Sequence, residues 1–371
     1  MLRNRDVNVK ITFVLPSYQN RPSGGFKVVY EYANHLVLNG HTVTIVYLWT
    51  PQKPSSHRFQ QKPFSQLNRH RKQLVYRGRR PKVSWYGLHR DVKLVKATDL
   101  ESRRIPNADV IFATAWQTAS SVNECPSEKG SKFYLVMDFA PWLGDKDDIE
   151  QTWRLPLKKI CISSWLAELV VQADAPKEEV EAIPIAVDHD RFRLTNSIHR
   201  RPKKVVMLYS SKTYKRSQMG ISVLSKCKDA VPSLEASLFG PLAQRPAPPP
   251  SWSEYYGSIS DSELVKLYNE ASIYLCSSAA EGFALPPAEA MACGCAVVTT
   301  DCGGNRDYAV HETTALVSDP DDFVSLVINV LRLLSDEELR VKIALAGRDR
   351  IAEFTWEKST RRLIEFVNHH R

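Results

Sequence analysis

The sequence predicts an α/β protein made of two doubly wound domains, each built on a parallel sheet covered by helices, which face each other across a cleft. Three observations support this prediction. The chain has 371 residues, more than one hydrophobic core usually supports. Short β-branched runs alternate with amphipathic segments, and the alternation restarts after a polar stretch. The runs are apolar on both faces, as strands buried on both sides of a parallel sheet require.

The alternation begins near residue 9. There "VKITFVLP" predicts a strand, "FKVVYEYANHLVLNG" an amphipathic helix and "HTVTIVYLW" a second strand. This order gives a parallel unit with a right-handed crossover. Further buried strands are predicted at "ADVIFATA", "KFYLVMD", "KKICISS" and "EAIPIAV". We therefore assign residues 1–195 to an N-terminal domain.

A polar and basic stretch, "DRFRLTNSIHRRPKK", interrupts the pattern at residues 190–204 and predicts an interdomain linker. Strand-like runs then resume with "VVMLYSS", "SLEASLFG", "ASIYLCSS", "CAVVTTD" and "TALVSD". Residues 200–354 are assigned to a second domain of the same class. A last helix, within residues 355–371, is expected to pack back on the N-terminal domain.

Composition points to an ordinary globular protein, because 43% of the residues are hydrophobic and 25% are charged. No run of about 18 apolar residues indicates a membrane span, and the first residues lack the apolar segment of a secretory signal, so a cytoplasmic location is expected. Seven scattered cysteines favour reduced thiols over a disulfide framework. Cys293, Cys295 and Cys302 lack the spacing of a zinc site, and no metal is predicted.

The formal net charge of +9 indicates an anionic partner. Much of the excess lies in an insert at residues 51–90, which contains eleven Lys or Arg and neither Asp nor Glu. Such a run is either a solvated loop or a contact with an anionic surface, for instance the inner face of the cell membrane. Its aromatic residues could stack nucleic-acid bases, but no recognition-helix or RNA-module signature accompanies them, so nucleic acid is not expected as a partner.

The most informative stretch is "EGFALPPAEAMA" at residues 281–292, which holds two glutamates eight positions apart. It follows a predicted strand, so Glu281 is expected in a loop at the carboxyl edge of the sheet, where ligands of such folds bind. Pro287 suits the first turn of a helix. Glu289 is then expected in that same first turn, near the positive end of the helix dipole.

Free amides at a helix start, together with Gly282, offer a seat for a diphosphate. The paired oxygens of Glu281 and Glu289 match vicinal hydroxyls of a sugar or a ribose. Taken singly, Glu289 could merely favour its helix end and Glu281 could be an exposed loop acid. The combination favours a nucleotide sugar as the ligand.

The longer stretch "EGFALPPAEAMACGCAVVTTDCGGNRDYA" resembles the signature of the family 4 retaining glycosyltransferases, also called glycosyl transferases group 1. The resemblance extends over nearly the whole chain. It is specific in the second domain and weaker in the first, where a Gly24-Gly25 loop and "NGHTVTIV" carry it. It implies the GT-B fold, in which two Rossmann-like domains face each other across a cleft.

The resemblance implies roles for individual residues. Glu281 is expected to contact the donor sugar and Glu289 the ribose of the nucleotide. The sugar and diphosphate would rest on main-chain amides, contributed by Gly282, Phe283, Ala284 and Leu285. Gly24 and Gly25 would let the first-domain backbone approach the phosphates or the acceptor, a plain turn being the alternative.

The chain also departs from the family pattern. Where a glycine, an arginine and then a lysine are usual, it has "LYSSKTYKRSQMG". Lys212 is available there for donor binding, and Lys215 and Arg216 are favoured as catalytic cations because they directly precede the next predicted helix. Ala284 replaces a glycine, and the usual histidine after the fourth strand is missing. Trp116, Gln117 and Asp138 are at comparable loop positions, and Asp138 is the preferred candidate for acceptor-side chemistry, a buried structural aspartate being the alternative.

The function that follows is transfer of a sugar from a nucleotide-diphosphate sugar to a glycan, polysaccharide or lipid-linked acceptor, with retention at the anomeric carbon. The class is hexosyl- or deoxyhexosyltransferase, without a metal and with no cofactor beyond the nucleotide sugar as co-substrate. The alternative is a catalytically silent nucleotide-sugar-binding scaffold of a glycan-assembly complex.

Overall fold

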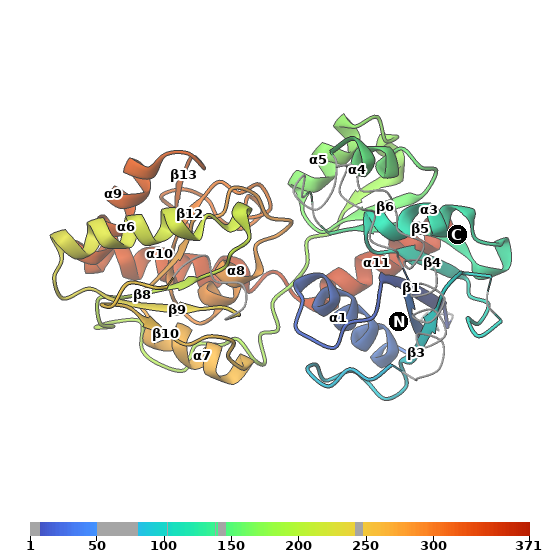
Figure 1. The fold of residues 1–371 in the computed structure, drawn as a ribbon, viewed down its shortest axis with the longest axis horizontal. Coiled ribbons are helices and arrows are strands. Elements are labelled where there is room, and N and C mark those ends of the chain that lie inside the picture. Colours follow the sequence, from blue (N-terminus) through green and yellow to red (C-terminus); the bar gives the residue numbers. More distant parts are fainter. Residues whose placement is uncertain (1–7, 50–80, 102, 138, 140–145, 242–247) are drawn as a thin grey trace, which may run out of the picture.

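The computed structural model describes residues 8–49, 81–101, 103–137, 139, 146–241 and 248–371. These residues form two α/β domains that lie beside each other, as Figure 1 shows. The prediction of two doubly wound domains is confirmed. Most of the basic insert at 51–90 lies outside the described residues, and only residues 81–90 of it are covered.

The first domain contains a seven-stranded sheet in the order β3-β2-β1-β4-β5-β6-β7, and all its paired strands are parallel. The strands are β1 (Lys10–Pro16), β2 (Thr42–Leu48), β3 (Lys93–Ala97), β4 (Val110–Ala113), β5 (Ser131–Val136), β6 (Lys158–Cys161) and β7 (Val180–Ala182). The strand order reverses between β1 and β4, and the sheet therefore has a switch point there.

Four described helices connect these strands: α1 (Gly24–Leu38), α3 (Trp116–Glu124), α4 (Lys146–Trp153) and α5 (Ser164–Gln172). The strand β1 is buried along Ile11–Leu15, as its apolar run predicts. Phe13 stacks on Phe112 of β4 with ring centroids 5.1 Å apart. Burial on both faces explains why these strands show no polar alternation.

The second domain contains a six-stranded parallel sheet in the order β10-β9-β8-β11-β12-β13. The strands are β8 (Lys204–Leu208), β9 (Glu235–Phe239), β10 (Glu254–Tyr255), β11 (Ile273–Cys276), β12 (Ala296–Thr300) and β13 (Leu316–Ser318). Its helices are α6 (Ser217–Ala230), α7 (Asp261–Glu270), α8 (Leu285–Ala292), α9 (Phe323–Ser335) and α10 (Glu337–Ile351). The switch point lies between β8 and β11, so the loops after these two strands are the expected ligand site.

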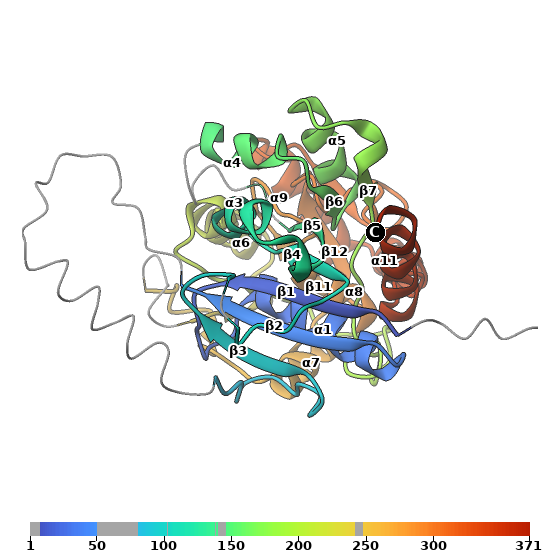
Figure 2. The ribbon, with the colours of Figure 1, turned by 90° about the vertical axis from the view of Figure 1, so that its right-hand side faces the viewer.

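The last helix, α11 (Trp356–His370), returns to the first domain. Trp356 packs edge-on against Tyr32 of α1 with centroids 5.1 Å apart. Ser359 donates to the carbonyl oxygen of Pro184 at 2.8 Å, and Arg362 donates to that of Ala182 in β7. Figure 2 shows α11 along the edge of the first domain, beside β7. The chain therefore crosses between the domains twice, once after β7 and once before α11.

No helix in the described part of the chain is long and apolar enough to cross a membrane. All seven cysteines are buried free thiols.

Arg201, in the segment that leads into β8, is almost fully buried. Its guanidinium donates to five backbone carbonyl oxygens, those of Asn196, Ser197, Tyr268, Ala271 and Cys293. Arginine suits this position because its planar group carries five N–H donors. This side chain fastens the linker to the second domain.

Replacing Arg201 by Met should therefore remove the guanidinium donor from all five carbonyls. We expect the free energy of unfolding to fall by about 3 kcal/mol or more, measured by urea denaturation followed by circular dichroism. Arg361→Met, at an exposed position of α11, is the matched control. An equal effect of both substitutions would contradict this account of Arg201.

Candidate functional site

Glu281 lies in the loop that follows β11, at the carboxyl edge of the second sheet. Its backbone is fixed by the turn after β12, because its N–H donates to Cys302 O at 2.9 Å and its carbonyl oxygen accepts from Gly304 N at 3.1 Å. A Cβ atom on Gly304 would lie 2.4 Å from the Glu281 carbonyl oxygen. Only glycine at position 304 therefore lets the two loops approach this closely.

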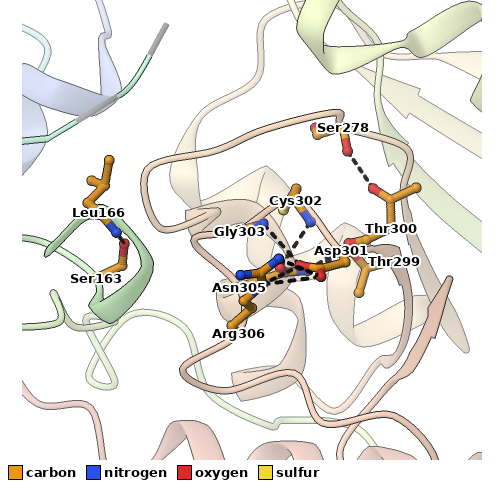
Figure 3. Close-up of polar contacts among 10 residues, drawn as sticks. All are labelled: Ser163, Leu166, Ser278, Thr299, Thr300, Asp301, Cys302, Gly303, Asn305 and Arg306. Atoms are coloured by element: carbon orange, nitrogen blue, oxygen red, sulfur yellow. Dashed lines mark hydrogen bonds and ion pairs between the residues drawn. The ribbon is translucent and has the colours of Figure 1, made fainter. Parts of the chain in front are cut away.

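Figure 3 shows the hydrogen bonds that hold the turn after β12 in place. Arg306 and Asp301 form an ion pair with an N···O distance of 2.8 Å, and the amide of Asn305 donates to Thr299 and Thr300. The Thr300 hydroxyl donates to the carbonyl oxygen of Ser278 at 2.5 Å. The turn after β12 thus braces the loop that carries Glu281.

The Glu281 carboxylate is paired with Lys215. Its Oε1 atom accepts from Lys215 Nζ at 2.5 Å and from the Ser278 hydroxyl at 2.6 Å. The side chains of Lys215 and Glu281 are 14% and 12% exposed, so the pair is largely shielded but still reachable from solvent. Burial by itself would lower the pKa of Lys215, but the Glu281 carboxylate outweighs it and the pKa is raised. Lys215 therefore stays a cation.

Lys215 belongs to the segment between β8 and α6, on the other side of the switch point. The hydroxyl of Ser277 donates to the carbonyl oxygens of Lys215 and Arg216, both at 3.1 Å. Ala279 N donates to Tyr214 O at 2.7 Å. The loops after β8 and β11 are thereby joined, and their junction places a lysine against a carboxylate.

The other two basic residues of this segment do not join the pair. Arg216 has a positive φ of 46° and points its guanidinium to Pro320 O and to Asp321 Oδ1, at 2.6 and 2.7 Å. Lys212 is exposed, with its Nζ 5.5 Å from the ring centroid of Tyr214. The structure thus brings Lys215 to Glu281 and directs Arg216 to the loop before α9.

The helix α8 begins at Leu285, after Ala284 in the left-handed conformation (φ 63°, ψ 67°). This is the position where the family pattern has glycine, which adopts such angles without strain. The Ala284 carbonyl oxygen accepts from the Tyr308 hydroxyl at 2.6 Å, and Phe283 is buried against the Tyr308 ring. These contacts hold the strained residue in place.

The prediction that Glu289 lies in the first turn of this helix is wrong. The helix starts two residues before Pro287, because both Pro286 and Pro287 fit its first turn, and Glu289 is its fifth residue. The helix dipole therefore acts on Glu289 less than we expected, since the effect is confined to the first turn. The backbone N–H groups of Gly282–Leu285 precede the two prolines and remain at the helix start.

Glu289 is 6% exposed and faces the first domain. Its Oε1 atom accepts from Lys27 Nζ of α1 at 2.8 Å. Burial raises the pKa of Glu289, and the charge of Lys27 opposes that shift. Sequence reasoning missed Lys27, because nothing near position 27 signals a partner 262 positions away.

A cavity of about 750 Å³ lies between the two domains next to Lys27. Its walls come from both domains and the linker, and include Gly24, Lys27, Trp85, Arg193, Ile259 and Ser260. Gly24 is the first residue of α1 and has open space where a side chain would be, whereas Gly25 faces Met137. A much smaller recess is lined by Lys215, Glu281 and the two prolines of α8.

One candidate residue is not placed. Asp138 lies outside the described residues, as do residues 51–80 of the basic insert. The end of the insert is held at the cleft, where Tyr18 donates to Lys82 O at 2.7 Å and Asn20 donates to the Ser84 hydroxyl at 2.8 Å.

The site therefore combines a shielded lysine–glutamate pair, main-chain amides at a helix start and a second glutamate facing the other domain. Amides and a lysine can stabilise negative charge that develops on a leaving group. Carboxylates can accept from pairs of hydroxyl groups. Among the described residues, no group of three potential metal ligands accompanies them.

Comparison with known proteins matches residues 253–350 to the family model described as glycosyl transferases group 1. The O-antigen chain mannosyltransferase B of Escherichia coli is 33% identical over 113 residues, which is 30% of this chain and 29% of that protein. The O-antigen biosynthesis protein RfbC of Myxococcus xanthus is 27% identical over 278 residues, 70% of this chain and 21% of that protein. The chain thus spans less than a third of the length of these relatives.

Solved structures resemble the whole chain. Anabaena Alr3699/HepE in complex with UDP and glucose has a TM-score of 0.73 at 15% identity, and the match covers 98% of this chain and 100% of that one. Sucrose-phosphate synthase from Thermosynechococcus elongatus has a TM-score of 0.70 at 16% identity, covering 97% and 98%. At these identities the likeness establishes the fold, and the prediction of GT-B architecture is confirmed.

The contact at Gly304 can be tested by stability alone. In Gly304→Ala the new methyl group must push the Glu281 loop away, and we expect the free energy of unfolding to fall by roughly 1–3 kcal/mol. Gly87→Ala is the control, since nothing lies within 4 Å of its added Cβ. Equal melting temperatures for both variants, measured by calorimetry, would show that the two loops are not in such close contact.

Proposed function

We propose that this chain, whose residues 253–350 match the family model described as glycosyl transferases group 1, transfers a sugar from a nucleoside-diphosphate sugar to a hydroxyl of a glycan acceptor. One observation carries the proposal. The Lys215–Glu281 pair lies at the switch point of the second sheet, beside the main-chain amides at the start of α8. At the edge where ligands of such sheets bind, this arrangement offers a cation and a carboxylate that can accept hydrogen bonds from sugar hydroxyls.

In the proposed complex the donor lies along the start of α8. Its sugar hydroxyls bind Glu281, its diphosphate rests on the amides of Gly282–Leu285 beside Lys215, and its ribose reaches Glu289. The HepE structures, solved in complex with UDP and glucose or with UDP-glucose, support a nucleotide sugar as the donor class. The name of the E. coli relative, a mannosyltransferase, supports a hexose.

The proposed mechanism follows from the charges that develop as the donor bond breaks. As the bond between the anomeric carbon and the phosphate oxygen breaks, the carbon becomes oxocarbenium-like and the diphosphate gains negative charge. Lys215 and fixed amides stabilise that charge without having to reorganise, which typically lowers a barrier by several kcal/mol. Glu281 keeps Lys215 charged and oriented while it also binds the sugar. Arg216 has no part in this proposed step, because its guanidinium is bound to Asp321 and Pro320.

We further propose that the acceptor oxygen attacks the face from which the diphosphate leaves. The new bond joins that oxygen to the anomeric carbon, and its proton passes to an oxygen of the departing phosphate. The configuration is then retained, and no side-chain base is needed. Asp138 remains the candidate on the acceptor side.

Glu281→Gln and Lys215→Met should each reduce the release of nucleoside diphosphate from the productive donor by about 100-fold or more. UDP-glucose, GDP-mannose and ADP-glucose would be tested in parallel by product chromatography. Glu365→Gln, an exposed site on α11, is the matched control, and calorimetry checks that each variant is folded.

Unchanged turnover in both folded variants would contradict the assignment. If the native chain binds a donor but neither hydrolyses nor transfers it, the chain is instead the silent nucleotide-sugar-binding scaffold.

The reaction should also proceed without a divalent ion, because Lys215 and the helix-start amides supply the positive charge that a metal would otherwise provide. We expect turnover to stay within about twofold after treatment with EDTA. Loss of activity on chelation, restored by Mg²⁺ or Mn²⁺, would refute this part of the mechanism.

A further inference from the structure

Lys27 and Glu289 form an ion pair between the domains. Lys27 is the fourth residue of α1 in the first domain, and Glu289 is the fifth of α8 in the second. The Nζ–Oε1 distance is 2.8 Å, and the side chains are 19% and 8% exposed. Figure 1 shows α1 and α8 on the facing sides of the two domains. The pair therefore spans the cleft close to the amides at the start of α8.

The charge of Lys27 depends on carboxylates outside its own helix turn. The first turn of α1 contains no acidic residue, and the positive end of a helix disfavours a cation. Burial acts to lower the pKa of Lys27, but Glu289, Asp261 and Glu31 together raise it. Lys27 is thus a cation whose closest negative partner belongs to the other domain.

That partner is the residue that binds ribose in the proposed function, on which this inference rests. Two vicinal hydroxyls donate to both oxygens of a carboxylate, so a ribose on Glu289 competes with Lys27 for Oε1. A lysine that loses a buried anionic partner needs another anion nearby. The diphosphate of the same donor, lying on the amides at the start of α8, is such an anion.

Arg191, the neighbouring cation, is less free than Lys27 to move to the diphosphate. Arg191 is bound to Asp261 and lies 3.3 Å from Asp188. Lys27 has a flexible stem with three rotatable N–H donors, which suits a charge that changes partners. Its ammonium group also lies 4.9 Å from the ring centroid of Phe192 in the linker. This cation–π contact favours the charged form of Lys27, whether its anionic partner is Glu289 or a phosphate.

We propose that Lys27 is the cation that the first domain contributes to the donor diphosphate: donor binding moves it from Glu289 to a phosphate oxygen. In the empty cleft Lys27 neutralises Glu289, and in the donor complex it neutralises part of the leaving group. Binding of the diphosphate then draws the first domain onto a ligand held by the second.

The decisive measurement is the ratio of nucleoside-diphosphate affinity to nucleoside affinity. Titration calorimetry would use three probe pairs: UDP with uridine, GDP with guanosine, and ADP with adenosine. In Lys27→Met we expect the diphosphate of the preferred base to bind about tenfold or more weakly, because a charge-assisted contact is lost. The nucleoside should bind as well as before or more tightly, since Glu289 has lost its competitor.

Two variants accompany this test. Lys27→Arg keeps the charge and should restore most of the diphosphate affinity, whereas Lys342→Met, at an exposed position of α10, should change neither affinity. Lys27→Met leaves Glu289 buried and unpaired, so the same substitution is also made in the Glu289→Gln background. The ratio of diphosphate to nucleoside affinity should again be lower in Lys27→Met/Glu289→Gln than in Glu289→Gln alone.

Equal loss of nucleoside and diphosphate affinity in Lys27→Met, or no loss of either, would overturn this role for Lys27 while leaving the proposed function intact. A native chain that binds none of the three diphosphates would overturn the proposed function and this inference together.

Discussion

The contact between Lys215 and Glu281 joins the two loops on either side of the switch point in the second sheet. Both side chains are partly withdrawn from water, and the charge of Lys215 is supported by the Glu281 carboxylate. Backbone contacts keep the two groups together: Ser277 fixes the lysine segment, and the turn at Gly304 fixes the glutamate loop. The arrangement of the start of α8, and with it the amides there, rests on this junction.

Strain is concentrated at the same place. Ala284 adopts left-handed angles that cost an ordinary residue roughly 1–2 kcal/mol. The Tyr308 hydroxyl and the buried Phe283 ring maintain this conformation. Strain of this kind persists where the surrounding structure fixes the backbone, and it often accompanies a site that must be prearranged. Here the strained residue Ala284 and its neighbour Phe283 are among those whose amides are proposed to hold the donor.

Much of the architecture could be predicted from local patterns. Doubly buried strands lack polar alternation, and most strands of both sheets were recognisable for that reason. The edge strands β3 and β10 were not predicted, because they are only partly buried. The loop position of Glu281 followed from the strand before it. Pro287 lies in the first turn of α8 as expected, but Glu289 lies beyond that turn, because Pro286 suits a first turn as well as Pro287 does and a sequence does not reveal the left-handed residue at which the helix begins.

Contacts that depend on how distant segments meet could not be predicted. Lys215 and Arg216 are adjacent in sequence, yet one points to Glu281 and the other to Asp321, because Arg216 ends its turn with a positive φ. The partner of Glu289 comes from the other domain. No spacing rule relates positions 27 and 289, since their contact depends on how two separate sheets dock.

The return of α11 to the first domain restricts how the molecule can move. The domains are connected by two crossings, and Trp356, Leu363 and Val367 of the second crossing's helix are buried. Sliding or full separation would have to unpack these side chains, whereas rotation about the line through both crossings leaves them in place. Any opening or closing of the cleft is therefore expected to be a rotation of one domain against the other about these two crossings.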